Sequence, residues 1–525
     1  SMDTEDSICR KWYGALVKRW PHVPVTMLSA LIFGVLAHGA ALFQKFSMVD
    51  DPQFLFNVGV TYRSGRWCLG LMGALTRWLF GTPNFSLPLF GGILCLVMLG
   101  ACACVVIPML GLERKSEWIL TSGLMVIFPV NAGLLGYLFT APYYLVGLLM
   151  ALLGCSFLCA KRDIFSLAGG AVLIACSVGI YQAYISTVLC LFLVDFLRRA
   201  WSKEQWGWKE LLKDAAWYVL CCGAFLAVYM VFNRVALRLS GNDLSSYNSI
   251  NDPLKGGMPV FWARIQKAYL WFFQPEKTEL ASADMFPGGL HRLHKICLVL
   301  TGIGFGAYIY RQFQRSCARG VAGCLALLVL PLAVNFIHVM VDPAFVHTLM
   351  VYSQVFFWLI PYCLIRWCLP LCGKIRLRQW AGRGLCLFLA IVCLFYVRLD
   401  NAAYLKLELY QSRTIQYFTT LVTQVKSLDG YRGDMKLAVV NHRENADPTL
   451  VEIEELSGFT IEPIRDIRSM VDAYSFREFV NMWCGFDMEV VDGAAFAALP
   501  EVEAMPHYPD DGSMCIIDDT VVIKF

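Results

Sequence analysis

Residues 86–110 read SLPLFGGILCLVMLGACACVVIPML and contain no charged side chain. A helix needs about 20 apolar residues to cross the roughly 30 Å of hydrocarbon in a bilayer, so this stretch is long enough to span it. Similar apolar runs recur through the first four hundred residues of the chain. The pattern predicts an all-α polytopic membrane protein and excludes a soluble globular enzyme.

Charged residues divide these runs into about eleven candidate transmembrane helices by the hydropathy criterion. The candidates are residues 25–43, 86–110, 117–137, 142–160, 164–181, 184–198, 214–235, 295–310, 320–341, 346–365 and 384–399. We expect the first run to stay as an anchor, because it follows a polar segment and lacks the small-residue cleavage pattern of a signal peptide.

Composition supports the same class and divides the chain in two. Hydrophobic residues make up 58% of the 525 residues and charged residues 16%, against about 25% charged residues in soluble domains. Residues 1–399 carry 34 Lys and Arg against 18 Asp and Glu, whereas residues 400–525 carry 10 against 22. The reversal of sign predicts that the two parts lie in different compartments.

Basic residues fall on alternate connections between the predicted spans. They cluster around residues 10–19, 114–115, 161–162, 198–213, 311–319 and 366–383. Because Lys and Arg favour the cytoplasmic side, we expect these connections and the N-terminal segment 1–24 to be cytoplasmic. An odd number of spans then places the C-terminus outside. Two long connections, residues 44–85 and 236–294, also lie outside, and we expect function to concentrate there.

Three segments of these outer connections have a helical pattern: Pro52–Tyr62, Trp67–Phe80 and Met258–Phe273. The second is too short to span a membrane. The third carries apolar and aromatic residues at helical spacing. We expect Trp67–Phe80 and Met258–Phe273 to lie in the membrane interface.

Residues 400–525 have the composition of a soluble domain. The pattern predicts an amphipathic helix over 400–428, strands Lys436–Val440 and Met488–Val491, helices Tyr474–Trp483 and Ala494–Glu503, and a hairpin of Ser513–Ile517 with Thr520–Lys524. This is a small extracytoplasmic α/β domain after the membrane part, residues 25–399. Its Cys484 and Cys515 are either a disulfide of an oxidising compartment or two unrelated buried thiols.

The strongest local signal is the pair Asp50-Asp51, followed by Pro52, at the outer end of the first span. Adjacent carboxylates at a membrane boundary repel one another, so there is usually a reason for their presence. One interpretation is a general base of raised pKa. The other is an acidic N-cap before an N1 proline, which needs no function.

The same connection carries Arg63-Ser64-Gly65-Arg66-Trp67. Arginine suits bidentate phosphate recognition, the glycine allows a tight turn, and tryptophan favours the headgroup level. The alternative is that both arginines extend to lipid headgroups.

Aromatic and amide side chains recur in Tyr181-Gln182-Ala183-Tyr184, at the outer break between two spans. Aromatic faces beside an amide suit a sugar ring, although the aromatic belt of a membrane protein has the same composition. For Tyr143-Tyr144 the belt is the favoured interpretation.

Weaker candidates are His347 beside Asp342-Pro343, Asn335 and His338 within a span, and Arg234 at the end of another. Arg234 either meets a phosphate or anchors its helix. His291 and His294 have helical spacing for a metal, but no nearby carboxylate or cysteine supports a closed site, so a metal site is the less favoured interpretation.

No usable nucleotide-binding motif occurs, and the cytoplasmic connections are short. An activated donor is therefore expected to be lipid-borne and external. Nothing in the pattern indicates a nucleic-acid partner.

In Asp50-Asp51, Ser64-Gly65-Arg66-Trp67, Gly179–Tyr184 and the segment that starts Asp400-Asn401, the chain resembles the bacterial type II O-antigen glucosyltransferases of the GT-C superfamily. The resemblance implies transfer of glucose, or another hexose, from a polyprenyl-phosphate sugar to a hydroxyl of an envelope glycan, outside the bacterial inner membrane.

The residues fit such a reaction. Asp50 or Asp51 would be the catalytic base, with Asp50 slightly favoured because Asp51 suits capping. The donor phosphate would meet Arg66, with Arg63 and Arg234 as further candidates. Sugar or acceptor would contact Trp67, Tyr181, Gln182, Tyr184 and His347. No metal is required, although the two aspartates leave a divalent cation open.

Two other classes of protein remain open. A lipid-linked saccharide carrier or flippase would also show many spans and boundary charges, but it should carry internal repeats and charge near the membrane midplane. An envelope polymerase or ligase would keep the arginines but give the paired aspartates no particular role.

Overall fold

The computed structural model describes residues 18–245, 256–277, 285–441, 450–458, 466–472 and 474–525. Within these ranges, eight helices are long and apolar enough to cross a membrane. A ninth span is formed if the bent pair α6 (Lys115–Ile127) and α7 (Pro129–Leu135) is counted as one. The predicted all-α polytopic class is confirmed.

The eight helices coincide with the predicted apolar runs. They are α2 (His22–Phe43), α5 (Pro88–Leu110), α8 (Ala141–Ala160), α11 (Trp208–Ser240), α13 (Gly289–Arg315), α14 (Cys317–Val334), the segment Tyr352–Leu371 around α16 (Val355–Cys368), and α17 (Ile375–Lys426). The runs at 164–181 and 184–198 form the shorter or more charged helices α9 (Ile164–Val178) and α10 (Ile185–Ser202). Each of the predicted runs is therefore helical. Among the described residues, fewer than eleven of these helices are long and apolar enough to cross a membrane.

Small residues let the helices of the bundle approach closely. Helix α5 crosses α2 where a Cβ added at Gly92 would lie 2.3 Å from Leu42 Cδ2. In a membrane, such small contacts replace the hydrophobic driving force that packs soluble helices. Large aromatic side chains including Phe128, Phe356 and Trp358 are fully buried.

Short elements close the end of the bundle at which α2 terminates. They are α3 (Asp51–Phe54), η1 (Tyr62–Ser64), α4 (Trp67–Phe80), η2 (Gln182–Tyr184), α12 (Gly257–Phe273), η4 (Pro275–Lys277), α15 (Ile337–Met340), η5 (Pro343–Phe345), η6 (Thr348–Met350) and η7 (Tyr352–Gln354). The predicted helices Trp67–Phe80 and Met258–Phe273 are confirmed by α4 and α12.

The predicted helix Pro52–Tyr62 is wrong beyond its first turn. Its backbone leaves the helix after Phe54, and Asn57 Oδ1 accepts the backbone N–H of Gly59 at 2.7 Å. Gly59 has a φ of +87°, a conformation that favours glycine and interrupts a helix. The segment is a turn that carries the chain toward η1.

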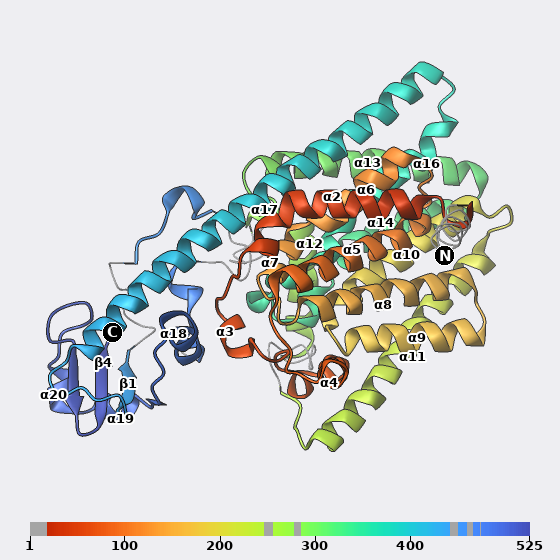
Figure 1. The fold of residues 1–525 in the computed structure, drawn as a ribbon. Helices are drawn as coiled ribbons and strands as arrows, with labels where there is room; N and C mark the ends of the chain where they lie inside the picture. The colour runs from red at the N-terminus through yellow and green to blue at the C-terminus, as the bar shows by residue number, and fades with distance from the viewer. Residues whose placement is uncertain (1–17, 246–255, 278–284, 442–449, 459–465, 473) are drawn as a thin grey trace, which may run out of the picture.

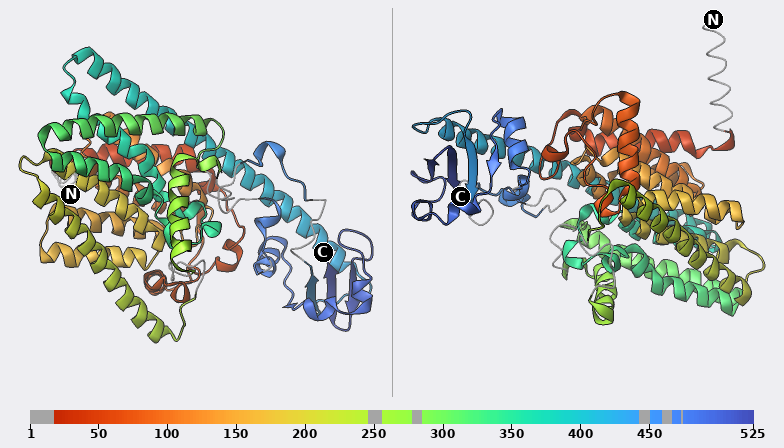
Figure 2. Two further views of the ribbon diagram at one scale, coloured as in Figure 1. Left: turned by 180° about the vertical axis from the view of Figure 1, so that it is seen from behind. Right: turned by 90° about the horizontal axis from the view of Figure 1, so that it is seen from below.

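Helix α17 joins the bundle to the C-terminal domain. It runs unbroken through 52 residues, about 78 Å at 1.5 Å per residue. The span expected at 384–399 and the amphipathic helix expected at 400–428 are thus one element. Figures 1 and 2 show it leaving the bundle and ending among the strands of the domain.

The C-terminal domain is the small α/β unit that the sequence predicts. Its strands are β1 (Lys436–Val440), β2 (Val490–Val491), β3 (Met514–Ile517) and β4 (Thr520–Lys524). The sheet has the order β2-β1-β4-β3, with β1 parallel to β2 and β4, and β3 antiparallel to β4. The helical elements are η9 (Glu454–Leu456), η10 (Arg468–Met470), α18 (Phe476–Cys484), α19 (Ala494–Ala497) and α20 (Pro500–Glu503). The helix expected at 494–503 is divided before Pro500, and Cys484 and Cys515 are both free thiols.

Candidate active site

The two adjacent aspartates have different surroundings. Asp51 is fully buried, and Lys45 Nζ donates to both of its carboxylate oxygens at 2.8 and 2.7 Å. Ser47 and Ser86 donate to the same oxygens at 2.7 and 2.8 Å. Because all of these hydrogen bonds come from side chains of the protein, Asp51 anchors the connection that follows α2.

Asp50 faces a cavity instead. It occupies the N-cap position of α3, but its side chain makes no capping hydrogen bond, so the capping interpretation is wrong for this residue. Its Oδ1 accepts a hydrogen bond from the Tyr474 hydroxyl of the C-terminal domain. The pair predicted from sequence is therefore one buried anchor and one carboxylate at a cavity wall.

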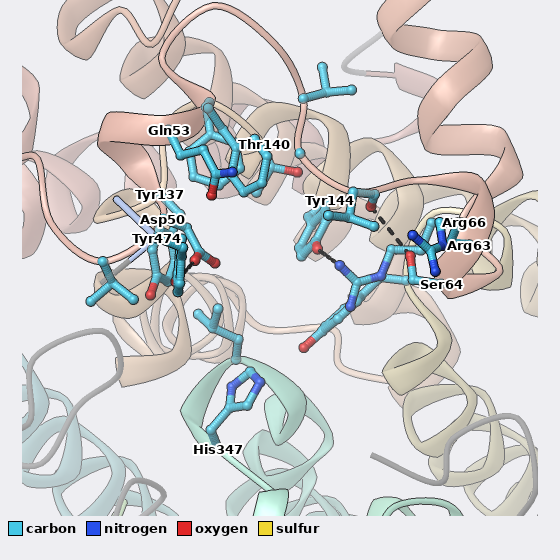
Figure 3. A pocket seen from close by; sticks show the side chains of 18 of the residues that line it. Asp50, Gln53, Arg63, Ser64, Arg66, Tyr137, Thr140, Tyr144, His347 and Tyr474 are labelled. Atoms are coloured by element: carbon cyan, nitrogen blue, oxygen red, sulfur yellow. Dashed lines mark hydrogen bonds between the residues drawn. The ribbon is translucent and has the colours of Figure 1, made fainter. Parts of the chain in front are cut away.

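The cavity has a volume of about 620 Å³ and is lined by residues of the short elements at the end of the bundle together with Asp472 and Tyr474 of the C-terminal domain. Figure 3 shows Asp50, Tyr474 and Tyr137 on one side of it and Arg63, Arg66 and Tyr144 on the other, with His347 on a third side. Its other lining residues are Val49, Gln53, Phe54, Val58, Gly59, Val60, Ser64, Phe139, Thr140, Tyr181, Ser245, Leu349 and Asp472. A carboxylate thus opposes two guanidinium groups across a partly enclosed space.

The electrostatics of Asp50 suit a proton acceptor. Burial raises the pKa of its carboxyl above the ordinary aspartate value, and the negative charges of Asp472 and Asp51 raise it further. The Tyr474 hydroxyl and the positive charge of Arg66 lower it. A carboxylate whose pKa is raised binds a proton more strongly, which is what a general base needs.

Arg66 is held on the opposite wall by two tyrosines. Its Nη1 donates to the Tyr144 hydroxyl at 2.8 Å, and its guanidinium lies 5.2 Å from the centre of the Tyr181 ring. The two rings stack on each other at 4.4 Å. Such contacts fix the orientation of a planar cation more tightly than solvent would.

The backbone that carries Arg66 is held from behind. Gln182 Nε2 donates to Ser64 O at 2.6 Å, and Tyr229 donates to Gly65 O at 3.1 Å. Gly65 has a φ of +76°, which only a residue without a Cβ adopts readily. The turn predicted from Arg63–Trp67 is therefore real, and its position depends on η2.

Trp67 packs against the backbone at Gly179, just before η2. A Cβ added at Gly179 would lie 2.6 Å from the Trp67 ring, and the backbone of Cys68 donates to Gly179 O at 2.8 Å. Tyr184 is buried and meets Tyr181 edge to face at 5.4 Å. Trp67, Gln182 and Tyr184 lie behind the cavity wall rather than in it.

Five of the sequence candidates line one cavity: Asp50, Arg63, Arg66, Tyr181 and His347. Arg234 is exposed and lines a separate hollow of about 460 Å³ with Arg238, at the end of α11. The structure thus brings the base candidate and two arginines together and separates Arg234 from them.

The remaining polar candidates have structural partners. Asp342 caps η5 through Ala344 N at 3.0 Å, and Asn335 donates to Ala268 O at 3.1 Å. His338 is buried and stacks on Trp271 at 5.4 Å. These contacts hold the connection that presents His347.

Both histidines of the pair His291 and His294 have partners within the protein. His294 Nε2 bonds to Phe272 O at 3.0 Å. The expectation that no carboxylate lies nearby is wrong, since Glu276 comes within 3.6 Å of His291. Across the described residues, no group of three or more His, Cys, Asp or Glu side chains is arranged to hold a metal ion.

The family model described as glucosyl transferase GtrII matches residues 39–358, which is more than half of the chain. This chain belongs to the GtrII glucosyl transferase family. It is a membrane glucosyltransferase with several apolar helices. No curated protein and no solved structure matches it.

The matched region of this GtrII protein includes every cavity residue from Val49 to Leu349. Asp472 and Tyr474 lie outside it, on the C-terminal domain, and sequence reasoning missed both. No local motif marks them, because they reach the cavity only through the docking of that domain. Tyr144 was assigned to an aromatic belt, and this interpretation is wrong, since its hydroxyl binds Arg66 at 2.8 Å.

Proposed function

We propose that this GtrII protein is a GT-C enzyme that transfers glucose from polyprenyl-phosphate glucose to a hydroxyl of an envelope glycan. The observation that carries the proposal is the opposition of Asp50 and Arg66 across one cavity. An inverting transfer needs a base on one side of the anomeric carbon and a stabilised leaving group on the other. Asp50 on one wall of the cavity would act as the base, and Arg66 on the opposite wall would stabilise the leaving group.

The proposed reaction is a single displacement. Asp50 takes the proton of the acceptor hydroxyl, whose oxygen then bonds to C1 of glucose. The bond between C1 and the phosphate oxygen breaks, and polyprenyl phosphate leaves with the electron pair. Arg66, assisted by Arg63, neutralises the negative charge that develops on this phosphate.

The stacked rings of Tyr144 and Tyr181 offer an apolar face beside Arg66, and His347 offers a further polar group to the hexose or acceptor. In this proposal Trp67, Gln182 and Tyr184 act indirectly by holding that wall. Because guanidinium groups alone can stabilise a leaving phosphate, we propose that no metal is required. A divalent cation bridging both aspartates would have to compete with Lys45 for Asp51.

The donor is proposed to be lipid-borne because helix α4, which begins directly after the cavity residue Arg66, and helix α12 both expose apolar side chains. Helix α4 exposes an apolar stripe that includes Leu71, Leu75 and Trp78, and α12 exposes Met258 and Trp262. Exposed apolar side chains of this size indicate contact with acyl or prenyl chains. These two helices would guide the prenyl chain while its phosphate reaches Arg66.

Orientation follows from the distribution of basic residues. With Lys and Arg of alternate connections in the cytoplasm, the cavity and residues 400–525 face outward from the bacterial inner membrane. The N-terminal segment is then cytoplasmic, residues 25–399 form the catalytic membrane domain, and the outer domain meets the acceptor glycan.

A direct test is glucose transfer by the full chain in lipid nanodiscs. The substrates are synthetic polyprenyl-phosphate glucose with radiolabelled sugar and a panel of envelope glycans. We expect Asp50→Asn to reduce turnover by about 10²–10⁴-fold, the usual contribution of a general base, while donor binding is kept. Asp342→Asn is the matched control, because this acid caps η5, does not line the cavity, and asparagine caps as well as aspartate.

Full turnover by Asp50→Asn would reject the proposed base. The carrier hypothesis makes a different prediction: saturable binding and transbilayer movement of the lipid-linked sugar, with no transfer to any glycan by the wild type.

A further inference from the structure

The C-terminal domain reaches into the connection that carries Asp50. Val49 donates its backbone N–H to Met470 O at 2.8 Å, and the Tyr474 hydroxyl donates to the Asp50 carboxylate. Helix α18 packs beside α3 at the same place. These contacts join residues more than four hundred positions apart in the chain.

Val49 has an unusual backbone. Its φ is +51°, in the left-handed region that β-branched residues rarely adopt. Such a conformation persists only where the surrounding structure holds it, and such residues cluster at functional sites. Here the hydrogen bond to Met470 O fixes the peptide between Met48 and Val49, one residue before Asp50. The direction of the Asp50 side chain therefore depends on the position of the domain.

Two side chains of the domain act directly on Asp50. Tyr474 donates its hydroxyl to the carboxylate, and the negative charge of Asp472 acts on Asp50 and Tyr474 alike. Burial, reinforced by both carboxylates, raises the pKa of Tyr474 well above its ordinary value, so the hydroxyl keeps its proton. The charged groups of the membrane part that act on Asp50 are Arg66 and Asp51.

We infer that the C-terminal domain completes the catalytic site, with Tyr474 and Asp472 as positioning residues of the base. Tyr474 orients the carboxylate and stabilises its charged form, while Asp472 places a second negative charge beside it and favours its protonated form. The inference rests on the proposed role of Asp50. It explains why a domain outside the matched family region contributes side chains to the cavity.

The two residues act in opposite directions, which gives a test that loss of folding cannot imitate. The measurement is kcat/KM for glucose transfer against pH, with the full chain in nanodiscs. A base works only when deprotonated, so its rate falls on the acid side as pH drops through its pKa. Tyr474→Phe removes a hydrogen bond to the charged form, so the acid limb moves to higher pH. Asp472→Asn removes a like charge, so the limb moves to lower pH.

At a pH on the acid limb we expect kcat/KM of Tyr474→Phe to fall several-fold below that of the wild type, and that of Asp472→Asn to rise several-fold above it. Donor KM should change little in either variant. Tyr431→Phe and Asp510→Asn are matched controls, because both residues lie on the same domain but not at the cavity.

Shifts in the same direction, or activity losses with an unchanged pH profile, would overturn the inference and leave the domain a structural support. If the wild type transfers glucose, Asp50→Asn is inactive and both variants keep the wild-type profile, the inference alone fails. If Asp50→Asn keeps full activity, the proposed base fails, and the inference fails with it.

Discussion

Asp51→Asn is predicted to destabilise the protein, whereas Asp50→Asn is not. Asp51 is fully buried and pairs with Lys45, whose side chain is 23% exposed. Removing one partner of a buried ion pair costs about 3–5 kcal/mol because the other charge is left uncompensated. Since Lys45 retains some access to water, we take the lower end, about 3 kcal/mol. The hydrogen bonds from Ser47 and Ser86 also weaken when their acceptor loses its charge.

Asp50→Asn keeps an oxygen that can accept from Tyr474 and relieves the repulsion between adjacent carboxylates. We expect its free energy of unfolding to change by less than about 1 kcal/mol, as for most substitutions away from packed cores. The assay is chemical unfolding of the detergent-solubilised protein followed by tryptophan fluorescence, with turnover measured on the same preparations.

Wild-type stability for Asp51→Asn together with lost turnover would refute the reasoning, because Asp51 would then act in the chemistry and not as an anchor. A larger loss of stability for Asp50→Asn than for Asp51→Asn would refute it equally.

Three further predictions concern the cavity wall that carries Arg66 and the orientation of the chain in the membrane. Arg66→Gln should lower kcat/KM by about 10²–10³-fold, the usual effect of losing a group that stabilises transition-state charge. Arg66→Lys should recover only part of this, because an ammonium ion does not reproduce the planar fork that donates to Tyr144 and lies over the Tyr181 ring; full recovery would contradict a role for the guanidinium geometry. Gly179→Ala should lower turnover, because its Cβ would lie 2.6 Å from the Trp67 ring and displace the arginine turn, whereas Gly39→Ala, which meets nothing within 4 Å, should not; equal activity of the two variants would contradict the supporting role of Gly179. A membrane-impermeant maleimide, read out by mass spectrometry, should label Cys484 from the outer side and the exposed Cys317 only from the cytoplasmic side; the reverse pattern would invert the proposed orientation.

The sequence predicted the helical framework because a long apolar run determines its own structure in a membrane. A run such as residues 86–110 has no other way to satisfy its backbone in a bilayer than as a helix. The short, largely apolar run Lys436–Val440 likewise predicted a strand with the bounds that β1 has. The local sequence pattern was sufficient to predict an element whose structure depends mainly on its own residues.

Local pattern failed where the outcome depends on distant contacts. The adjacent aspartates have nearly equal sequence context, yet Lys45 and Ser86 take one of them into the protein and leave the other at the cavity. Tyr144 and Tyr474 have no distinguishing motif, and each becomes part of the site through a partner 78 or 424 positions away. The arginine turn was predicted, but its dependence on Gln182 and Gly179 was not.

The central claim, that Asp50 and Arg66 act from opposite sides of the glucose, is tested most directly by the anomeric configuration of the product. Polyprenyl-phosphate glucose of defined configuration is supplied to the full chain, and the new linkage is read from the anomeric proton coupling in the NMR spectrum. A base on one wall and a phosphate clamp on the other predict inversion at C1 in a single displacement. Retention of configuration would contradict the account, since it would require a nucleophile on the protein and two successive displacements.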